Sequence, residues 1–206
     1  MIAQGSIRFI LPFMLVGTIL SYFIWFTGIP FLIFGLYLAW FFRDPNRKIQ
    51  ISDSSFLSPA DGKVIQVIHR SESTKIAVRM SPFNVHLNRS PLRGKVTSVT
   101  RTAGKHNSVY FSDVEKTNEK NLITIENEVV VCNVLQITGI FARRIECWIK
   151  TNEKVVQGQK IGIIRFGSQT NIHIRTLDNT KSIKPTVKVG DKVEAGISVL
   201  AIIEDA

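Results

Sequence analysis

The dipeptide Gly167-Ser168 has the chemistry of a peptide bond that can cleave itself. It lies between two runs of alternating apolar residues, 160–164 and 171–175, so we expect it on a turn between two strands. Glycine leaves its carbonyl carbon unshielded, and the hydroxyl of the following serine can attack that carbon. Most Gly-Ser pairs are ordinary turn residues, so the assignment depends on the residues that accompany this pair.

Self-cleavage also needs a base for the serine hydroxyl and a group that orients the base. His86, within a run of apolar residues, is the best base because imidazole titrates near neutral pH. Asp61, on a Pro-Ala-Asp-Gly turn, can hold that imidazole in one tautomer. By themselves, Asp61 could be a turn former and His86 a core histidine. We predict Ser168, His86 and Asp61 as catalytic residues, and no metal, because no group of His, Cys, Asp and Glu has metal-ligand spacing.

Five motifs extend this constellation, and together they resemble the short-type phosphatidylserine decarboxylase family. The resemblance covers the chain from about Phe41 to the C-terminus, and the motifs follow one another in the family's order. They are Phe41-Phe42-Arg43-Asp44-Pro45, Ser58-Pro59-Ala60-Asp61-Gly62-Lys63-Val64, and the segments 84–91, 137–145 and 159–168.

The resemblance implies a pyruvoyl-dependent enzyme that is made as a self-cleaving proenzyme. Ser168 would become the pyruvoyl group, and the chain would become two associated fragments, residues 1–167 and 168–206. The pyruvoyl ketone would form a Schiff base with the amine of a serine phospholipid, either phosphatidylserine or archaetidylserine, and carbon dioxide would leave to give the ethanolamine lipid. Guanidinium groups grip phosphate through two hydrogen bonds, so Arg89, Arg143 and Arg144 are candidates for binding the head-group phosphate.

Two positions depart from the family's pattern. Gln169 follows the cleavage serine where short-type members usually have arginine. Longer-type members have two histidines three residues apart where this chain has His86 and Arg89. His86 could therefore serve cleavage, decarboxylation or both.

The N-terminal part of the chain predicts a membrane segment. Residues 9–42 are 34 residues without a charge. A single helix of that length would be about 51 Å long, which exceeds a hydrocarbon core of ~30 Å. Because proline disfavours helix in the residue before it, we expect a break at Gly28-Ile29-Pro30 and two helices, 9–26 and 30–42. They would form a membrane hairpin or a shallowly inserted pair.

Charge predicts where the rest of the chain lies. Residues 43–206 contain 25 of the 26 basic residues and all 16 acidic ones, a net charge of +9. This excess suits an anionic membrane surface. Nucleic acid is disfavoured, because no nucleic-acid-binding motif is present and the aromatic residues are concentrated in the first 42 positions. Positive residues on both sides of the apolar segment predict the cell membrane, with the catalytic domain on the cytoplasmic side.

Residues 43–206 are predicted to form one mainly β domain after the helical segment 1–42. The stretch 102–121 is polar and reads as a loop or lid. A near-repeat, 155–162 and 187–196, resembles the turn-rich strands of lipoyl and biotinyl carrier domains and predicts a barrel-sandwich-like fold. Cys132 and Cys147 are expected to be free thiols. Ten β-branched or alternating runs are predicted strands: 64–68, 75–80, 96–101, 122–126, 129–137, 144–148, 160–164, 171–175, 182–187 and 197–203.

A second function class fits part of this pattern. A membrane-anchored barrel-sandwich module could bind or scaffold other molecules without ever cleaving itself. The carrier-like near-repeat and the helical segment favour it, whereas the Asp61, His86 and Ser168 motifs favour the enzyme.

Overall fold

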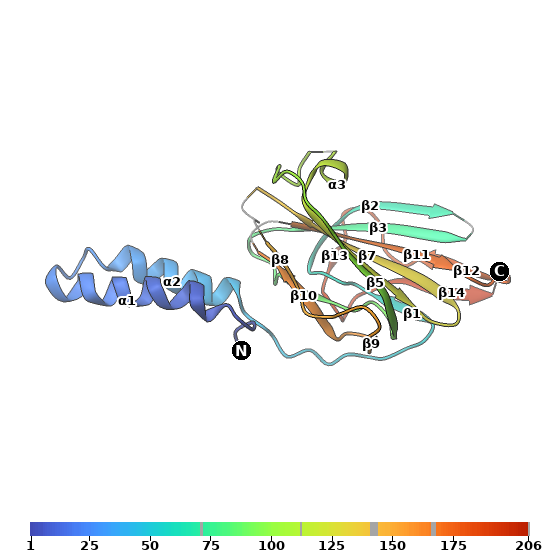
Figure 1. The fold of residues 1–206 in the computed structure, drawn as a ribbon, viewed down its shortest axis with the longest axis horizontal. Helices are drawn as coiled ribbons and strands as arrows, with labels where there is room; N and C mark the ends of the chain where they lie inside the picture. The colour runs from blue at the N-terminus through green and yellow to red at the C-terminus, as the bar shows by residue number, and fades with distance from the viewer. Residues whose placement is uncertain (71, 112, 141–143, 166–167, 206) are drawn as a thin grey trace. The chain divides into compact units, whose positions relative to one another are not determined.

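The computed structural model describes residues 1–70, 72–111, 113–140, 144–165 and 168–205 (Figure 1). The chain forms two compact units, Met1–Asn46 and Arg47–Ala206. The first is helical, and nearly all the regular secondary structure of the second is antiparallel strand.

The N-terminal unit is a pair of packed helices, α1 (Ile7–Phe23) and α2 (Ile29–Phe41). Gly28 is the N-cap of α2 and Pro30 lies in its first turn, so the helix break occurs where the sequence predicted it. Glycines allow the two backbones to approach closely. A Cβ on Gly17 would lie 2.8 Å from the side chain of Leu32, and one on Gly35 would lie 2.7 Å from the sulfur of Met14.

The structure does not support a hairpin of two membrane-crossing helices, one of the two arrangements that the sequence left open. In the described part of the chain, no helix combines the length and the hydropathy that a crossing needs. The helices have 17 and 13 residues, which correspond to about 26 Å and about 20 Å, less than a hydrocarbon core of ~30 Å. The charge-free stretch is long enough in total, but the break divides it into two short helices.

The second unit contains fourteen strands and one short helix among its described residues. Their bounds are β1 (Ser55–Leu57), β2 (Gly62–Arg70), β3 (Ser73–Met80), β4 (Leu87–Arg89), β5 (Gly94–Thr102), α3 (Val114–Thr117), β6 (Lys120–Glu126), β7 (Val130–Thr138), β8 (Ile145–Cys147), β9 (Lys154–Val155), β10 (Lys160–Ile164), β11 (Ser168–Thr176), β12 (Lys181–Pro185), β13 (Lys192–Val193) and β14 (Val199–Asp205).

A curled eight-stranded sheet is the largest sheet of this unit. Its order is β13-β2-β3-β11-β7-β6-β5-β9, and two three-stranded sheets, β1-β14-β12 and β4-β10-β8, accompany it. One apolar core joins the sheets. It includes Ile76, Ile172 and Val134 of the large sheet, Leu200 of the first small sheet and Ile161 of the second. The large sheet therefore has an inner face, which packs on the small sheets, and an outer face.

Each copy of the near-repeat seen in the sequence contributes residues to an edge strand of the large sheet. Edge strand β13 pairs Lys192 with Lys63 and Val193 with Gly62, and edge strand β9 pairs Lys154 with Lys95 and Val155 with Gly94. The inner partners β2 and β5 both show a register shift after the valine that follows this Gly-Lys pair. The two edges of the sheet thus share the same strand pairing and the same register shift.

All ten predicted strands have a counterpart in the structure, which confirms the mainly β prediction. Four short strands, β1, β4, β9 and β13, were not predicted, because two or three residues are too few to show a period. The stretch 102–121 is not wholly a loop, since it contains α3 and the start of β6. Cys132 and Cys147 are free thiols, as expected.

Candidate active site

Ser168 is the first residue of β11, a central strand of the large sheet. It lies opposite Met80 of β3 and Thr138 of β7. Side chains alternate along a strand, so Ser168 shares the inner face with the core residue Ile172. The serine is fully buried, and its hydroxyl lies 3.7 Å from the sulfur of Met80. Gly167, the other residue of the predicted cleavage site, lies outside the described residues.

A buried polar layer surrounds this end of the inner face. Asn121 of β6 donates to Gln136 of β7 at 2.8 Å, and Gln136 donates to Asn88 of β4 at 2.7 Å. Asn88 in turn donates to Thr170 of β11 and to the carbonyl of Pro59, both at 3.2 Å. Every member is at most 3 % exposed. Because breaking such a network leaves buried polar groups unsatisfied, it fixes β4 against the start of β11.

His86 lies immediately before β4 and is held against β10. Its backbone carbonyl accepts a hydrogen bond from the Ile164 N–H at 3.3 Å. The imidazole is buried, and its Nδ1 lies 2.9 Å from the Asn84 carbonyl oxygen. A carbonyl can only accept, so Nδ1 carries the proton and Nε2 is the basic nitrogen of the neutral ring. A backbone carbonyl therefore sets the tautomer that the sequence had assigned to Asp61.

Asp61 forms a buried ion pair with Arg47. The two guanidinium nitrogens Nη1 and Nη2 lie 2.6 Å and 2.7 Å from the two carboxylate oxygens. The pair also binds both backbone polar groups of Ala195. The Ala195 N–H donates to Asp61 at 2.8 Å, and Arg47 donates to the Ala195 carbonyl at 2.5 Å. In the described part of the chain, no hydrogen bond joins Asp61 to His86 or either of them to Ser168. The catalytic role of Asp61 stays a prediction.

Comparison with known proteins decides the family. The sequence profile described as phosphatidylserine decarboxylase matches residues 34–201. The chain belongs to this family. A phosphatidylserine decarboxylase proenzyme of Syntrophus aciditrophicus is 35% identical over 97% of this chain and 96% of the relative. A putative archaetidylserine decarboxylase proenzyme of Methanosarcina acetivorans is 40% identical over 82% of this chain and 76% of the relative. Another protein of that name, from Methanococcoides burtonii, is 38% identical over 86% and 81%.

Gln169, where short-type members of the family usually have arginine, lies on the outer face of the sheet. Its side chain donates to Asn171 at 2.8 Å, and Asn171 donates to Glu115 of α3 at 3.0 Å. Glu115 is also paired with Lys75 at 2.7 Å. Since Ser168 and Gln169 are neighbours in a strand, their side chains point to opposite faces. The family departure therefore lies on the outer face, where Lys75 supplies a cation, and not on the inner face that carries Ser168.

The arginines predicted to bind phosphate differ in their surroundings. Arg89 is buried and donates to the Gly158 carbonyl at 2.9 Å. Arg144 is exposed, and Arg143 lies outside the described residues. A fourth arginine was not predicted: Arg165, three residues before Ser168, is buried and paired with Glu146 of β8 at 2.7 Å. The side chain of Arg47 is also buried, in its ion pair with Asp61.

The Asn118-Glu119 pair lies beside the strand partner of Ser168. Asn118 donates to the carbonyl oxygens of Asn107 and Thr138, both at 2.8 Å. Glu119 accepts from Arg101, and its backbone carbonyl accepts from the Thr138 hydroxyl at 3.1 Å. His106 Nδ1 lies 3.3 Å from the same hydroxyl. The polar stretch 102–121 is thus tied to Thr138, next to Ser168, although its sequence alone assigned no role to these residues.

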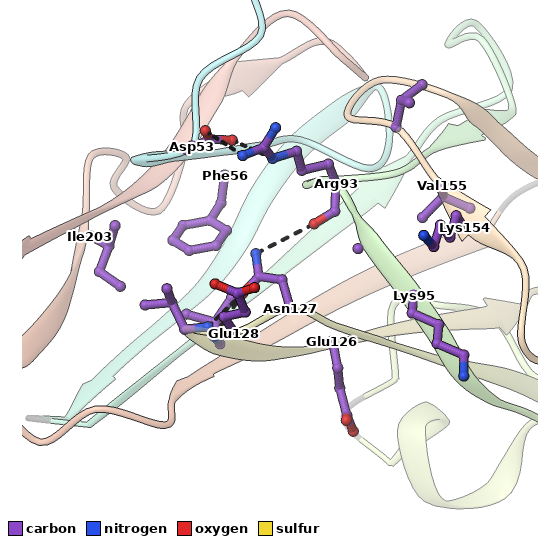
Figure 2. Close-up of a pocket in the computed structure, with 14 residues that line it drawn as sticks. Asp53, Phe56, Arg93, Lys95, Glu126, Asn127, Glu128, Lys154, Val155 and Ile203 are labelled. Carbon is purple, nitrogen blue, oxygen red and sulfur yellow. Dashed lines mark hydrogen bonds and ion pairs between the residues drawn. The ribbon is translucent and has the colours of Figure 1, made fainter.

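The cavity in Figure 2 lies at the other end of the sheet. It has a volume of about 610 Å³ and is lined by the turn between β6 and β7, the start of β5 and part of β9. This end is remote from Ser168, because Val130 of that turn pairs with Thr176 at the end of β11. The described lining residues include no serine, threonine, histidine or cysteine. Figure 2 shows Arg93 beside Asp53 at its rim.

Removing one partner of the Arg47–Asp61 pair is expected to destabilise the fold strongly. Removing one partner of a buried ion pair leaves an uncompensated charge and typically costs about 3–5 kcal/mol. We expect Arg47→Met to lower the free energy of unfolding by that amount, measured by urea denaturation in the Ser168→Ala background, in which a single chain unfolds.

The exposed pair Arg93–Asp53 is the matched control. Its side chains are 65% and 64% exposed, so Arg93→Met should cost at most about 1 kcal/mol. Equal losses in the two variants would show that Arg47 does not hold Asp61 as the geometry indicates.

Proposed function

We propose that this protein cleaves its own chain at Gly167-Ser168 and then decarboxylates the head group of a serine phospholipid through a pyruvoyl group at residue 168. The observation that carries the proposal is the position of Ser168. It is a fully buried serine at the start of a central strand, beside a polar layer, in a chain of the phosphatidylserine decarboxylase family. The product is the corresponding ethanolamine phospholipid.

Self-cleavage needs only groups of this chain and water. The Ser168 hydroxyl attacks the Gly167 carbonyl, the peptide C–N bond breaks, and an ester replaces it. Loss of the Ser168 Cα proton then expels the Gly167 carboxylate and leaves dehydroalanine, and water converts that residue to a ketone with release of ammonia. His86 Nε2 is the base for the hydroxyl proton, with the ring oriented by the Asn84 carbonyl.

The residues around position 168 suit a pyruvoyl group, which supplies an electron-withdrawing carbonyl for decarboxylation. Ser168, Thr138 and Thr170 are fully buried, so this part of the inner face is shielded from bulk water while it keeps polar partners. The His86 imidazole can deliver a proton from nitrogen to the carbon that loses carbon dioxide. Arg89, Arg143 and Arg144 are the groups that would hold the head-group phosphate.

The two fragments would remain associated after cleavage. Residues 168–206 contribute β11–β14, and β11 pairs along its whole length with β3 and β7 of the larger fragment. β13 pairs with β2, and β14 pairs with β1. Removing β11 would open the centre of the sheet and expose its apolar core, so the mature protein is a heterodimer of its own two fragments.

The helical unit would attach the protein to the cell membrane by shallow insertion. Large apolar side chains of both helices are exposed, among them Leu15, Ile19, Ile33 and Leu36. Exposed apolar surface of this extent is typical of a membrane contact. Arg8 in the first turn of α1 and Arg43 after α2 favour the cytoplasmic side for the catalytic unit. The near-repeat on the two sheet edges supports a barrel-sandwich-like catalytic unit.

Mass spectrometry of the purified protein tests the proposed function. We expect two fragments, residues 1–167 and 168–206, the latter with 39 residues and a blocked N-terminus. Carbon dioxide release from vesicles that contain a serine phospholipid should accompany them. A single intact chain in an active preparation would rule the proposal out, as would a small fragment with a free amino terminus.

A further inference from the structure

Three aromatic side chains of the second unit are strongly exposed. Phe83 is 70% exposed, Tyr110 72% and Phe111 62%, and the aliphatic Ile140 is 56% exposed. In the described part of this unit, the other exposed large hydrophobic side chains are all aliphatic. We call this surface the aromatic rim; it consists of Phe83, Tyr110, Phe111 and Ile140.

The rim residues come from three loops that meet at the end of the sheet where Ser168 begins β11. Ser168 pairs with Met80 and Thr138. Phe83 follows Met80 by three residues, and Ile140 follows Thr138 by two. Tyr110 joins them because the Arg79 guanidinium lies over its ring, 4.4 Å from the centroid. Phe111 is the next residue.

Exposed cations accompany the aromatic rim at this end of the sheet. At the Ser168 end the carboxylates Glu115 and Glu119 are ion-paired with Lys75 and Arg101, and Asp113 is the remaining exposed acid of the α3 segment. Exposed cations there are Lys63, Lys105, Lys116 and Arg144. The opposite end carries charges of both signs, since Glu126 and Glu128 lie there together with Lys95 and Lys154.

We propose that the aromatic rim is the surface through which the catalytic unit itself rests on an anionic phospholipid membrane. Aromatic side chains favour the membrane–water interface, and exposed Lys and Arg are attracted to anionic head groups. Ser168 is fully buried at the same end. This orientation rests on the proposed function in one respect: a phospholipid whose tails stay in the bilayer can present its head group only to a site that faces the bilayer.

Site-specific labelling of the full chain tests this contact. Phe111→Cys and Leu177→Cys each carry one exposed thiol, the second at the opposite end of the sheet, after β11. Burial raises the pKa of the Cys132 and Cys147 thiols, so an environment-sensitive fluorophore should react mainly with the new cysteine. The vesicles contain phosphatidylcholine and phosphatidylglycerol and lack serine head groups, so the signal does not depend on substrate binding.

We expect the label at position 111 to show a blue-shifted, several-fold stronger emission with these vesicles, and the label at position 177 to show little change. The response should weaken with vesicles of phosphatidylcholine alone and at high ionic strength. An unchanged signal at position 111, or equal responses at both positions, would overturn the proposal.

Activity supplies a second readout. The double variant Phe83→Ser/Phe111→Ser should lose about tenfold in carbon dioxide release from vesicles, since apolar burial in the membrane is removed. The loss should be confined to vesicles and absent with a short-chain, monomeric serine phospholipid. The control variant Leu177→Ser/Val156→Ser changes two exposed apolar residues at the other end and should behave as the wild type.

Equal losses on vesicles and on the monomeric lipid would mean that the rim supports the fold or the site rather than a membrane contact, and would overturn the proposal. If the wild type released carbon dioxide from neither substrate, the proposed function would fail. The labelling result would still decide the membrane contact, because its vesicles contain no substrate.

Discussion

Replacing Ser168 by alanine is expected to leave the chain uncleaved and without decarboxylase activity. Alanine has no oxygen to form the ester with Gly167, and no ketone can then arise at position 168. The fold should survive. Among the described residues, the one hydrogen-bond partner of the serine hydroxyl is the weak acceptor sulfur of Met80, at 3.7 Å, so its loss should change the free energy of unfolding by less than about 1 kcal/mol.

Gel electrophoresis follows the cleavage, and trapped carbon dioxide measures the activity. Ser90→Ala is the matched control, because Ser90 is also fully buried and donates to the Leu92 carbonyl at 2.7 Å. We expect the control to be cleaved and active. Decarboxylation by an intact Ser168→Ala chain would require another electron sink, such as pyridoxal phosphate, and would contradict the proposed cofactor.

Replacing His86 by glutamine should slow self-cleavage by about 10²–10⁴-fold, the usual contribution of a general base. The glutamine amide can still donate to the Asn84 carbonyl, but it has no basic nitrogen for the Ser168 proton. Uncleaved proenzyme should therefore accumulate while the protein remains folded. His173→Gln is the control, since His173 lines a pocket on the outer face of the same sheet with Lys75 and Asn171.

Two outcomes would change the assignment of His86. Normal cleavage without carbon dioxide release would assign the histidine to decarboxylation alone and remove it from the cleavage step. Normal cleavage together with normal release would leave His86 as a core histidine, and another base would have to serve Ser168. Both quantities are measured on the same preparation, so loss of folding, seen by circular dichroism, is separated from loss of chemistry.

Parts of this architecture follow from local sequence because their cause is local. Alternating apolar residues predict strands, and ten such runs became strands. Gly28-Ile29-Pro30 predicts the helix break, because the effects of proline act on adjacent residues. The predicted helices, 9–26 and 30–42, lie close to the observed Ile7–Phe23 and Ile29–Phe41, so their short lengths followed from the position of the break.

The residue at which β11 begins determines the face of the sheet on which Gln169 lies. The sequence predicted a strand from 171, whereas pairing with Met80 and Thr138 begins it at Ser168. Once Ser168 belongs to the strand, alternation places Ser168 on the inner face and Gln169 on the outer face. Cross-strand pairing with residues 80 and 138 is long-range, so no local pattern around 168 could fix that boundary.

The sequence by itself determined the chemical groups of this protein: a Gly-Ser bond, a histidine and an acid, each in a recognisable motif. Only the tertiary structure decided which groups meet. Asp61 pairs with Arg47 and Ala195, and the His86 ring is oriented by Asn84. The physical reason is that a hydrogen bond depends on a few ångströms of separation between atoms, and that separation is set by how strands far apart in the chain pack together.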